Sequence, residues 1–395
     1  MQPANTSFNL DQSGTHNARP CTPQGGLTLI ELMVAMVISI IVGIAIFEIF
    51  MQTEYGYLHN RGTGDIVNAD RHALNVVSTY LHNAGYGMAG LPGCQTTYTY
   101  STSTSSVVPV SAITVSPGGT PATSAPQPVS LTINMSASEF AGVPVGQMVR
   151  SPSISASNFQ LNSQPGAGTT CQTSIQSGDT LIGAFSGGAC GMVVATGTPS
   201  SQQGACVINF APGRNPSNPP GGFNSLIPNL TAPEMAAAQV YDVGNGQLSN
   251  LTFSVVPGTT AGPGQLQLSL GGATPALFAQ GIDDLQVLFG FNLAGGQSVT
   301  SYGYFPTTGQ ISSNPNLLSD IRTVMVVMVA QSGLKTPGTV TPNHNQLLLI
   351  PTIPASESET GSSLPAVYYQ PPAGVNSEQF NVMRTTVPVM NLIWH

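Results

Sequence analysis

The first strong pattern along the chain is an uninterrupted apolar run near its start. Sixteen residues from Leu32 to Phe47 carry no charge, and Glu31 and Glu48 bound them. As a helix, this run rises roughly 24 Å, slightly less than the ~30 Å hydrocarbon core of a bilayer. We therefore predict a helix over residues 27–51 that just spans a membrane, with both glutamates near the interfaces.

A second helical pattern follows a polar segment. Three glycines between Gln52 and Gly64 weaken a continuous helix, so the sequence predicts a hinge there. Apolar residues then recur at steps of three or four from Asp65, and Gly85 is a typical helix stop. The stripe comprises Ile66, Ala69, Ala73, Val77, Tyr80 and Ala84. We interpret residues 52–94 as an amphipathic stalk helix and its exit.

Strand patterns dominate the rest of the chain. Alternation in "QLQLSL", Gln265 to Leu270, predicts a half-exposed strand, and the apolar run Thr323 to Val329 predicts a buried central strand. Shorter strand candidates alternate with Gly and Pro, and Ser116 to Pro128 and Ala211 to Asn224 read as loops. We predict an α+β fold in which residues 95–395 form a large antiparallel β-rich globular domain.

Composition narrows the function classes. Only 6% of the 395 residues are charged, and 44 glycines and 32 prolines favour short strands and long loops over a helical enzyme. The net charge is −8 with eight basic residues, so the chain has no broad basic surface for phosphate backbones. We therefore expect no bulk nucleic-acid binding.

The cysteines indicate an oxidising compartment. No CxxC pair occurs among the five, and no histidine lies at a zinc-ligand spacing from them. Cys21 precedes the apolar run, and removal of the segment before this run leaves an even number of cysteines. The four remaining cysteines fit two disulfides in any of three pairings, and they are Cys94, Cys171, Cys190 and Cys206.

Candidate catalytic chemistry is sparse. The chain lacks a G-x-S-x-G elbow, an H-E-x-x-H helix, a phosphate-binding loop and a G-x-G-x-x-G motif. Asp283 and Asp284 are adjacent acids that suit general acid–base work or calcium. Neighbouring residues at the start of a strand point in different directions, so we favour turn or packing roles and keep them as weak metal candidates. We predict no enzyme activity and no cofactor.

The position of the apolar run separates three kinds of N-terminal signal. A secretory signal peptide needs a basic start and a small-residue cleavage site after the run, but here the run continues into "FEIFMQTEYGYL". A lipoprotein anchor needs its cysteine after the run, whereas Cys21 precedes it. The remaining pattern is Gly26, then "LTLIE", then an apolar helix. It resembles the class III signal of type IV pilins and type II secretion pseudopilins.

This resemblance implies processing at one bond. A prepilin peptidase would cut between Gly26 and Leu27, so that residues 1–26 are a leader and Leu27 becomes the N-methylated mature terminus. Glu31 is then the fifth mature residue. An ionised carboxylate among lipid tails is costly unless it is paired, and the cationic amine of Leu27, on a neighbouring subunit or its own, is the natural partner. The alternative is a glutamate that reaches the headgroups.

A second resemblance is narrower. The segment "RHALNVVSTYLHNAGYGMAGLPGC", Arg71 to Cys94, combines an apolar helix with an Asn-Ala-Gly-Tyr exit that ends in a cysteine. It resembles PilW-like minor pilins, as do three segments near the C-terminus, namely Phe278 to Phe291, Ile321 to Gly333 and Phe380 to Trp394. Residues 95–264 carry no such resemblance.

The resemblance implies a structural function. A PilW-like minor pilin would prime pilus assembly at or near the filament tip and support adhesion, motility or DNA uptake. Its expected partners are the prepilin peptidase, other minor pilins, the major pilin and a large tip adhesin. It would be a single-pass inner-membrane protein with a periplasmic domain before it reaches the pilus tip at the cell surface. Two alternatives stay open: a minor pseudopilin of type II secretion, and a surface-binding module displayed at the tip.

Overall fold

A computed structural model describes most of the chain. The described residues are 28–88, 91, 94–102, 105–123, 126–136, 143–148, 157–162, 171, 174–185, 188–202, 205–211, 213–227, 238–245, 249–259, 262–294, 296–307, 310–311, 314–334, 346–372 and 378–393. The chain divides into two compact units, Met1–Gly56 and Tyr57–His395. Gly26, Leu27 and Cys21 lie outside the described residues.

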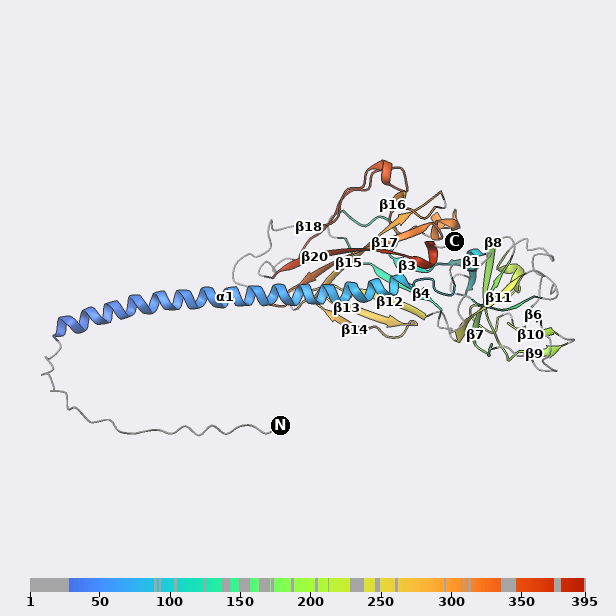
Figure 1. Ribbon diagram of the computed structural model, residues 1–395, viewed down its shortest axis with the longest axis horizontal. Coiled ribbons are helices and arrows are strands. Elements are labelled where there is room, and N and C mark those ends of the chain that lie inside the picture. The colour runs from blue at the N-terminus through green and yellow to red at the C-terminus, as the bar shows by residue number, and fades with distance from the viewer. Residues whose placement is uncertain are drawn as a thin grey trace, which may run out of the picture. The chain divides into compact units, whose positions relative to one another are not determined.

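A single helix, α1, runs from Leu29 to His82 over 54 residues (Figure 1). The hinge predicted between Gln52 and Gly64 is therefore wrong. Glycine costs only about 1 kcal/mol relative to alanine within a helix, which does not by itself interrupt a long one. Gly62 has a packing role instead, because a Cβ there would lie 2.9 Å from the hydroxyl of Ser332.

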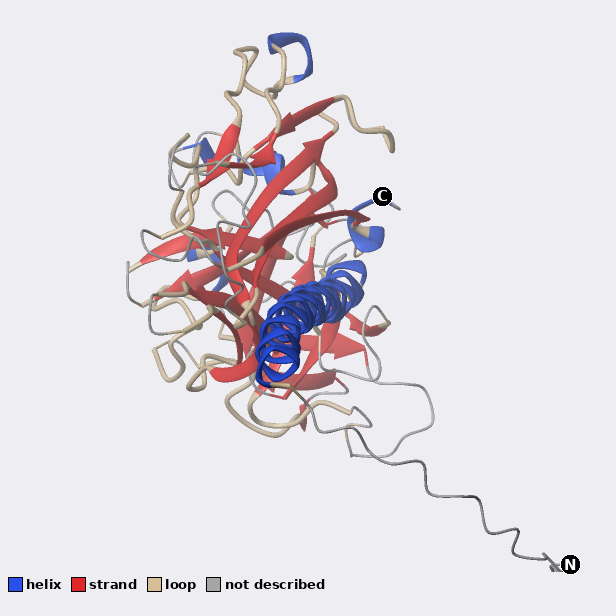
Figure 2. Ribbon diagram, turned by 90° about the vertical axis from the view of Figure 1, so that its left-hand side faces the viewer, coloured by secondary structure: helices blue, strands red, loops and turns tan. Residues whose placement is uncertain are grey.

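The second half of α1 buries the predicted stripe. Ile66, Ala73, Val77 and Leu81 are at most 4% exposed and join the largest hydrophobic core of the second unit. Beyond His82 the chain turns, and Gly85 adopts a φ of 76°, which favours glycine. The amphipathic pattern therefore packs this part of the helix against the strands, as Figure 2 shows in an end-on view of the helix.

Two antiparallel sheets supply the strands of this core. The five-stranded sheet has the order β14 (Ala276–Gln280), β13 (Gln265–Leu270), β12 (Ser249–Val256), β4 (Ser130–Met135), β3 (Ile113–Ser116). The four-stranded sheet has the order β16 (Ser301–Gly303), β15 (Ile282–Phe291), β17 (Ile321–Gln331), β20 (Phe380–Pro388). We call this part, with the second half of α1, the helix-bound part.

A second lobe has its own core. Its six-stranded sheet has the order β2 (Ser106–Val110), β1 (Cys94–Ser101), β8 (Gly188–Val194), β7 (Asp179–Ala184), β11 (Gln239–Asn245), β5 (Pro144–Gln147). A three-stranded sheet has the order β6 (Asn158–Asn162), β10 (Ala205–Asn209), β9 (Ser200–Gln202). Strands β1 and β8 pair in parallel, whereas the other paired strands of the two sheets are antiparallel. We call these nine strands the second lobe.

Short elements complete the chain. They are the two-stranded sheet β18 (Leu347–Ile350) and β19 (Val367–Tyr369), the single-turn helices η1 (Phe223–Ser225), η2 (Pro315–Leu318) and η3 (Ala355–Glu357), and helix α4 (Met390–Ile393). The β18–β19 pair covers one face of β15 and β17, where Leu349, Ile350 and Val367 pack with Val327 and Val329.

The strand predictions that rest on periodicity are confirmed. Gln265 to Leu270 is β13, and Thr323 to Val329 lies within β17, which pairs with strands on both sides. Ser116 to Pro128 and Ala211 to Asn224 contain little regular structure in their described residues, as predicted for loops. The α+β layout, a long N-terminal helix followed by a large β-rich domain, is also confirmed.

Candidate functional site

The start of α1 brings Glu31 against Thr28. The backbone N–H and the hydroxyl of Thr28 both donate to Oε2 of Glu31, at 3.3 and 3.4 Å, and the N–H of Glu31 donates to the Thr28 hydroxyl at 3.3 Å. This reciprocal pair is a capping box, which satisfies N–H groups that a helix start leaves free. Sequence reasoning missed it, although the T-x-x-E spacing was its signal.

Among the described residues of its own unit, none covers the apolar half of α1. Large hydrophobic side chains from Leu29 to Phe50 are about half exposed or more. Within the described residues, α1 is the one helix long and apolar enough to cross a membrane. Glu31 and Glu48 are both exposed at the two ends of the charge-free run. A bilayer or a bundle of like helices would remove this apolar surface from water.

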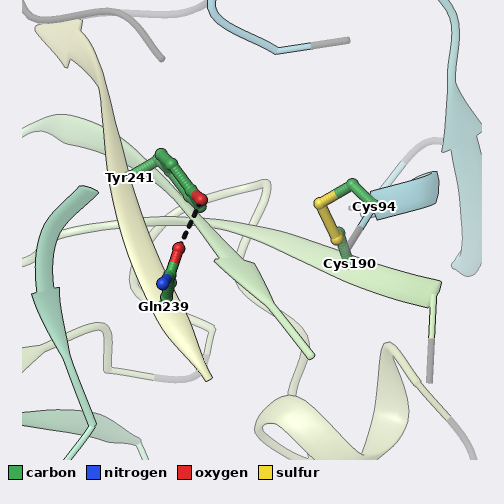
Figure 3. The surroundings of a disulfide bond; sticks show 4 residues. All are labelled: Cys94, Cys190, Gln239 and Tyr241. Atoms are coloured by element: carbon green, nitrogen blue, oxygen red, sulfur yellow. Dashed lines mark hydrogen bonds between the residues drawn. A yellow bond between two sulfur atoms is a disulfide. The ribbon is translucent and has the colours of Figure 1, made fainter. Parts of the chain in front are cut away.

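The four candidate cysteines form two disulfides. Cys94 pairs with Cys190 (Figure 3) and Cys171 pairs with Cys206, with Cα–Cα distances of 5.5 and 5.4 Å. Both bonds lie in the second lobe. The first joins the start of β1 to β8, its parallel neighbour, and the second joins the segment before β7 to β10. One of the three pairings left open by the sequence is thus present.

The exit from α1 leads directly into the second lobe. Met88 and Leu91, a few residues beyond the helix, are 4% and 3% exposed. They pack with Ile182, Cys190 and Tyr241 in a core cluster of the six-stranded sheet. Nearby, the hydroxyl of Tyr241 donates to the side chain of Gln239 at 2.6 Å (Figure 3). The lobe is therefore fastened to the helix exit by apolar packing and by the Cys94–Cys190 bond.

Asp283 and Asp284 lie at the start of β15, and each is 1% exposed. Asp283 accepts hydrogen bonds from the N–H of Gly258 and the hydroxyl of Tyr369. The Oδ1 atom of Asp284 instead accepts from the Leu285 N–H and the side chain of Gln286, at 2.8 and 2.9 Å. The two carboxylates thus have separate partners, as expected for packing roles.

The chemistry of Asp284 is that of a buried acid. Burial raises its pKa to about 7, although its two hydrogen bonds oppose the shift, and its Oδ2 atom has no hydrogen-bond partner among the described residues. Nowhere in the described part of the chain do three or more His, Cys, Asp or Glu side chains gather where they could hold a metal ion. Among the described residues, no third side chain therefore joins Asp283 and Asp284 to form a metal site.

Asp70 is a second buried acid, and sequence reasoning missed it. It is 0% exposed on the core-facing side of α1, between Ile66 and Ala73, and neither carboxylate oxygen has a hydrogen-bond partner in the described part of the chain. Burial raises its pKa from 3.8 to about 7. The sequence did carry a signal for its burial: Asp70 lies four residues after Ile66, so the helical period places both on the same face.

Polar contacts also attach α1 to the start of β20. The side chain of Gln379 bonds to the ring of His59, and its oxygen accepts from the Thr63 hydroxyl at 2.8 Å. Gly62, between these two residues, allows the close approach of Ser332. These contacts and the apolar stripe hold the helix against the sheets along its second half.

Comparison with known proteins identifies the N-terminal segment. Residues 21–47 match the family described as "Prokaryotic N-terminal methylation motif". No curated protein and no solved structure matches the chain. The motif indicates a type IV pilin-like or pseudopilin protein with a class III prepilin-like signal. It implies processing by a prepilin peptidase, anchoring in the membrane before assembly, and assembly with other pilins.

Proposed function

We propose that this protein is a PilW-like minor pilin that primes pilus assembly and sits at or near the filament tip. The observation that carries the proposal is the second lobe, which extends beyond the C-terminal end of α1 (Figure 1). Pilin-like helices stack along a filament, so a lobe beyond the helix end occupies the space of the next subunit toward the tip. A subunit in the first position has no such neighbour.

The start of α1 supports the assembly role of Glu31. Both bonds from Thr28 reach Oε2 of the carboxylate, so Oε1 is the atom we assign to the Leu27 amine of a neighbouring subunit. Such a pair forms where helices leave lipid for the filament core, in which a low dielectric strengthens the attraction. Cleavage between Gly26 and Leu27 would create that amine.

The two disulfides support a periplasmic or extracellular domain, because such bonds persist in oxidising compartments. The second lobe is also the part that a surface-binding role would use, since it has a hydrophobic core separate from that of the helix-bound part. Adhesion, motility or DNA uptake would then act through this lobe and through other minor pilins, the major pilin and a large tip adhesin. No catalytic activity is part of the proposal.

The first test is the location and processing of the protein in cells. Mass spectrometry of sheared filaments and of the membrane fraction should find a methylated Leu27 terminus, at low abundance in filaments. Labelling of the second lobe should mark filament ends. An intact leader would refute the pilin assignment. A processed protein confined to the membrane would favour the rival, a minor pseudopilin of type II secretion.

The second test separates the charge of Glu31 from its capping role. Glutamine also completes a capping box, so Glu31→Gln keeps the helix start and removes the charge. We expect this variant to be processed and inserted normally but to lose filament priming. The matched control is Glu48→Gln, at the other end of the same apolar run, which should prime normally. Normal priming by Glu31→Gln would refute the proposed ion pair.

A further inference from the structure

The two disulfides of the second lobe interlace along the chain. In sequence order the four cysteines are Cys94, Cys171, Cys190 and Cys206. The first pairs with the third, and the second pairs with the fourth. Each of the four cysteines therefore has another cysteine that is nearer to it in the sequence than its native partner.

Loop closure in the unfolded chain favours non-native bonds. The native pairs have sequence separations of 96 and 35 residues, whereas Cys190 and Cys206 are 16 residues apart and Cys171 and Cys190 are 19 apart. The probability that a loop closes falls roughly as the 3/2 power of its length. Cys206 therefore meets Cys190 about threefold more often than it meets Cys171. By the same relation, Cys190 meets Cys171 about elevenfold more often than it meets Cys94.

The native lobe cannot accommodate these short-range bonds, because its cysteines belong to two separate hydrophobic clusters. Cys94 and Cys190 pack in the cluster that receives Met88 from the helix exit. Cys171 and Cys206 pack in the other cluster. A bond from Cys190 to Cys171 or Cys206 would join cysteines of different clusters. Such a bond has to break before both clusters can form.

The chain has no thiol of its own for this exchange. A disulfide rearranges when a thiolate attacks one of its sulfur atoms. Cys21 lies in the predicted leader, and two bonds of any pairing use up the other four cysteines. In the folded lobe Cys190 and Cys206 are 0% and 2% exposed, so the exchange has to occur while the lobe is still open. The attacking thiolate therefore comes from another molecule.

We propose that this protein is a substrate of a thiol–disulfide isomerase in the compartment that receives its β-rich domain. The inference rests on the proposed periplasmic or extracellular location of that domain, because thiols in the cytoplasm are kept reduced. It adds a partner that acts before assembly and is distinct from the prepilin peptidase and the other pilins.

The exchange balances without a net oxidant or reductant. From the non-native pairs Cys94–Cys171 and Cys190–Cys206, the isomerase thiolate attacks Cys206, forms a mixed disulfide with it and releases Cys190 as a thiolate. This thiolate attacks Cys94, forms the first native bond and displaces Cys171. Cys171 then attacks Cys206, forms the second native bond and releases the isomerase thiolate. Two protein disulfides are present at the start and at the end.

The test is refolding of the full-length chain with Cys21→Ser, which keeps the leader cysteine out of the exchange. The protein is reduced and unfolded in urea and detergent, then reoxidised with diamide, which supplies no thiol. Mass spectrometry of non-reduced peptides measures each bond. We expect non-native bonds, mainly Cys190–Cys206 and Cys171–Cys190, to outnumber native bonds at least threefold. A catalytic amount of a purified bacterial disulfide isomerase in its reduced form should then convert most chains to native pairing.

Two control variants keep a single native pair. They are Cys94→Ser with Cys190→Ser, and Cys171→Ser with Cys206→Ser, each in the Cys21→Ser chain. Neither variant has an alternative partner for its remaining cysteines, so the isomerase should leave the yield of the remaining bond unchanged, whether or not the lobe folds. In cells, loss of the isomerase should lower the amount of natively paired four-cysteine protein at least threefold and leave the remaining bond of each control variant unchanged.

Four results would overturn the proposal. They are native pairing of the four-cysteine chain with diamide alone, non-native bonds that persist with the isomerase, an equal need for the isomerase in the single-pair variants, and unchanged native pairing in cells that lack it. The refolding assay contains no pilus component. A failure of the minor-pilin role would therefore leave its result unchanged, and the two proposals can fail separately.

Discussion

Asp70 should make the stability of the helix-bound part depend on pH. Its carboxyl group is 0% exposed, has no hydrogen-bond partner in the described part of the chain, and has its pKa raised from 3.8 to about 7 by burial. The folded-state pKa therefore lies above the unfolded-state value, and the folded protein holds the proton more tightly. The contribution of the neutral form is complete below about pH 4 and is lost as pH rises toward 7.

The size of the effect follows from the shift. A rise of roughly three pKa units corresponds to about 4 kcal/mol at about 1.4 kcal/mol per unit. Local rearrangement and water entry reduce that value, so we expect Asp70→Asn to stabilise the protein by about 2 to 4 kcal/mol at pH 8. For a domain of this size this is a rise of roughly 5 °C in Tm. At pH 4 the variant and the wild type should unfold at similar temperatures.

The assay is thermal unfolding of the full-length protein in nanodiscs, followed by circular dichroism at several pH values from 4 to 8. Asp65→Asn is the matched control, because Asp65 lies on the same helix with its side chain 67% exposed and 4.0 Å from Arg61. The control should change Tm little, since exposed ion pairs contribute at most about 1 kcal/mol. The reasoning is refuted if Asp70→Asn keeps the wild-type pH dependence or is less stable at pH 8.

Three further changes test the packing. Gly64→Ala should stabilise α1 by up to about 1 kcal/mol in thermal unfolding, whereas Gly62→Ala should not, because its Cβ would meet Ser332; equal gains would contradict the packing role. Joint replacement of Cys94 and Cys190 by serine should lower the free energy of unfolding by about 2 to 4 kcal/mol. Reductant should lower the Tm of the wild type, but it should not change the Tm of a variant that lacks both disulfides. Asp284→Asn should raise Tm at pH 8 and not at pH 4, because burial raises the pKa of Asp284 to about 7, and a loss at pH 8 would count against that.

The elements with strong periodicity were predictable from the sequence. The apolar stripe from Ile66 to Leu81 has the period of a helix, and the alternation of β13 has the period of a strand. The continuous apolar run of β17 has no such period, and its β-branched residues favoured a strand. The hinge prediction failed for a physical reason. A glycine has the same local propensity whether it bends a helix or makes room for a neighbour, and only the position of Ser332 distinguishes the two at Gly62.

The second lobe and the disulfide pairing were not predictable. Its strands are short, and partners such as β7 and β11 lie more than fifty residues apart, so no local pattern shows that they form a core of their own. Cys94 and Cys190 lie even further apart in the sequence, with a separation of 96 residues. For Asp70, the sequence could predict burial but not the surroundings of the carboxyl group. The helical period places it on the buried side, but only the fold reveals that no partner reaches it.

Glu31 and Asp70, two of the acids of α1, differ in what assembly can do for them. Glu31 is exposed and keeps one carboxylate oxygen clear of its capping contacts, so a subunit that packs beside the helix can bring an amine to it. Asp70 is closed off by the core that it interrupts. Its cost persists in the membrane and in a filament alike, and it is relieved only by protonation or by separation of the helix from the sheets. Assembly can therefore stabilise the ionised form of Glu31, because a neighbouring subunit can supply an amine. The ionised form of Asp70 only weakens the packing of the helix against the sheets as pH rises.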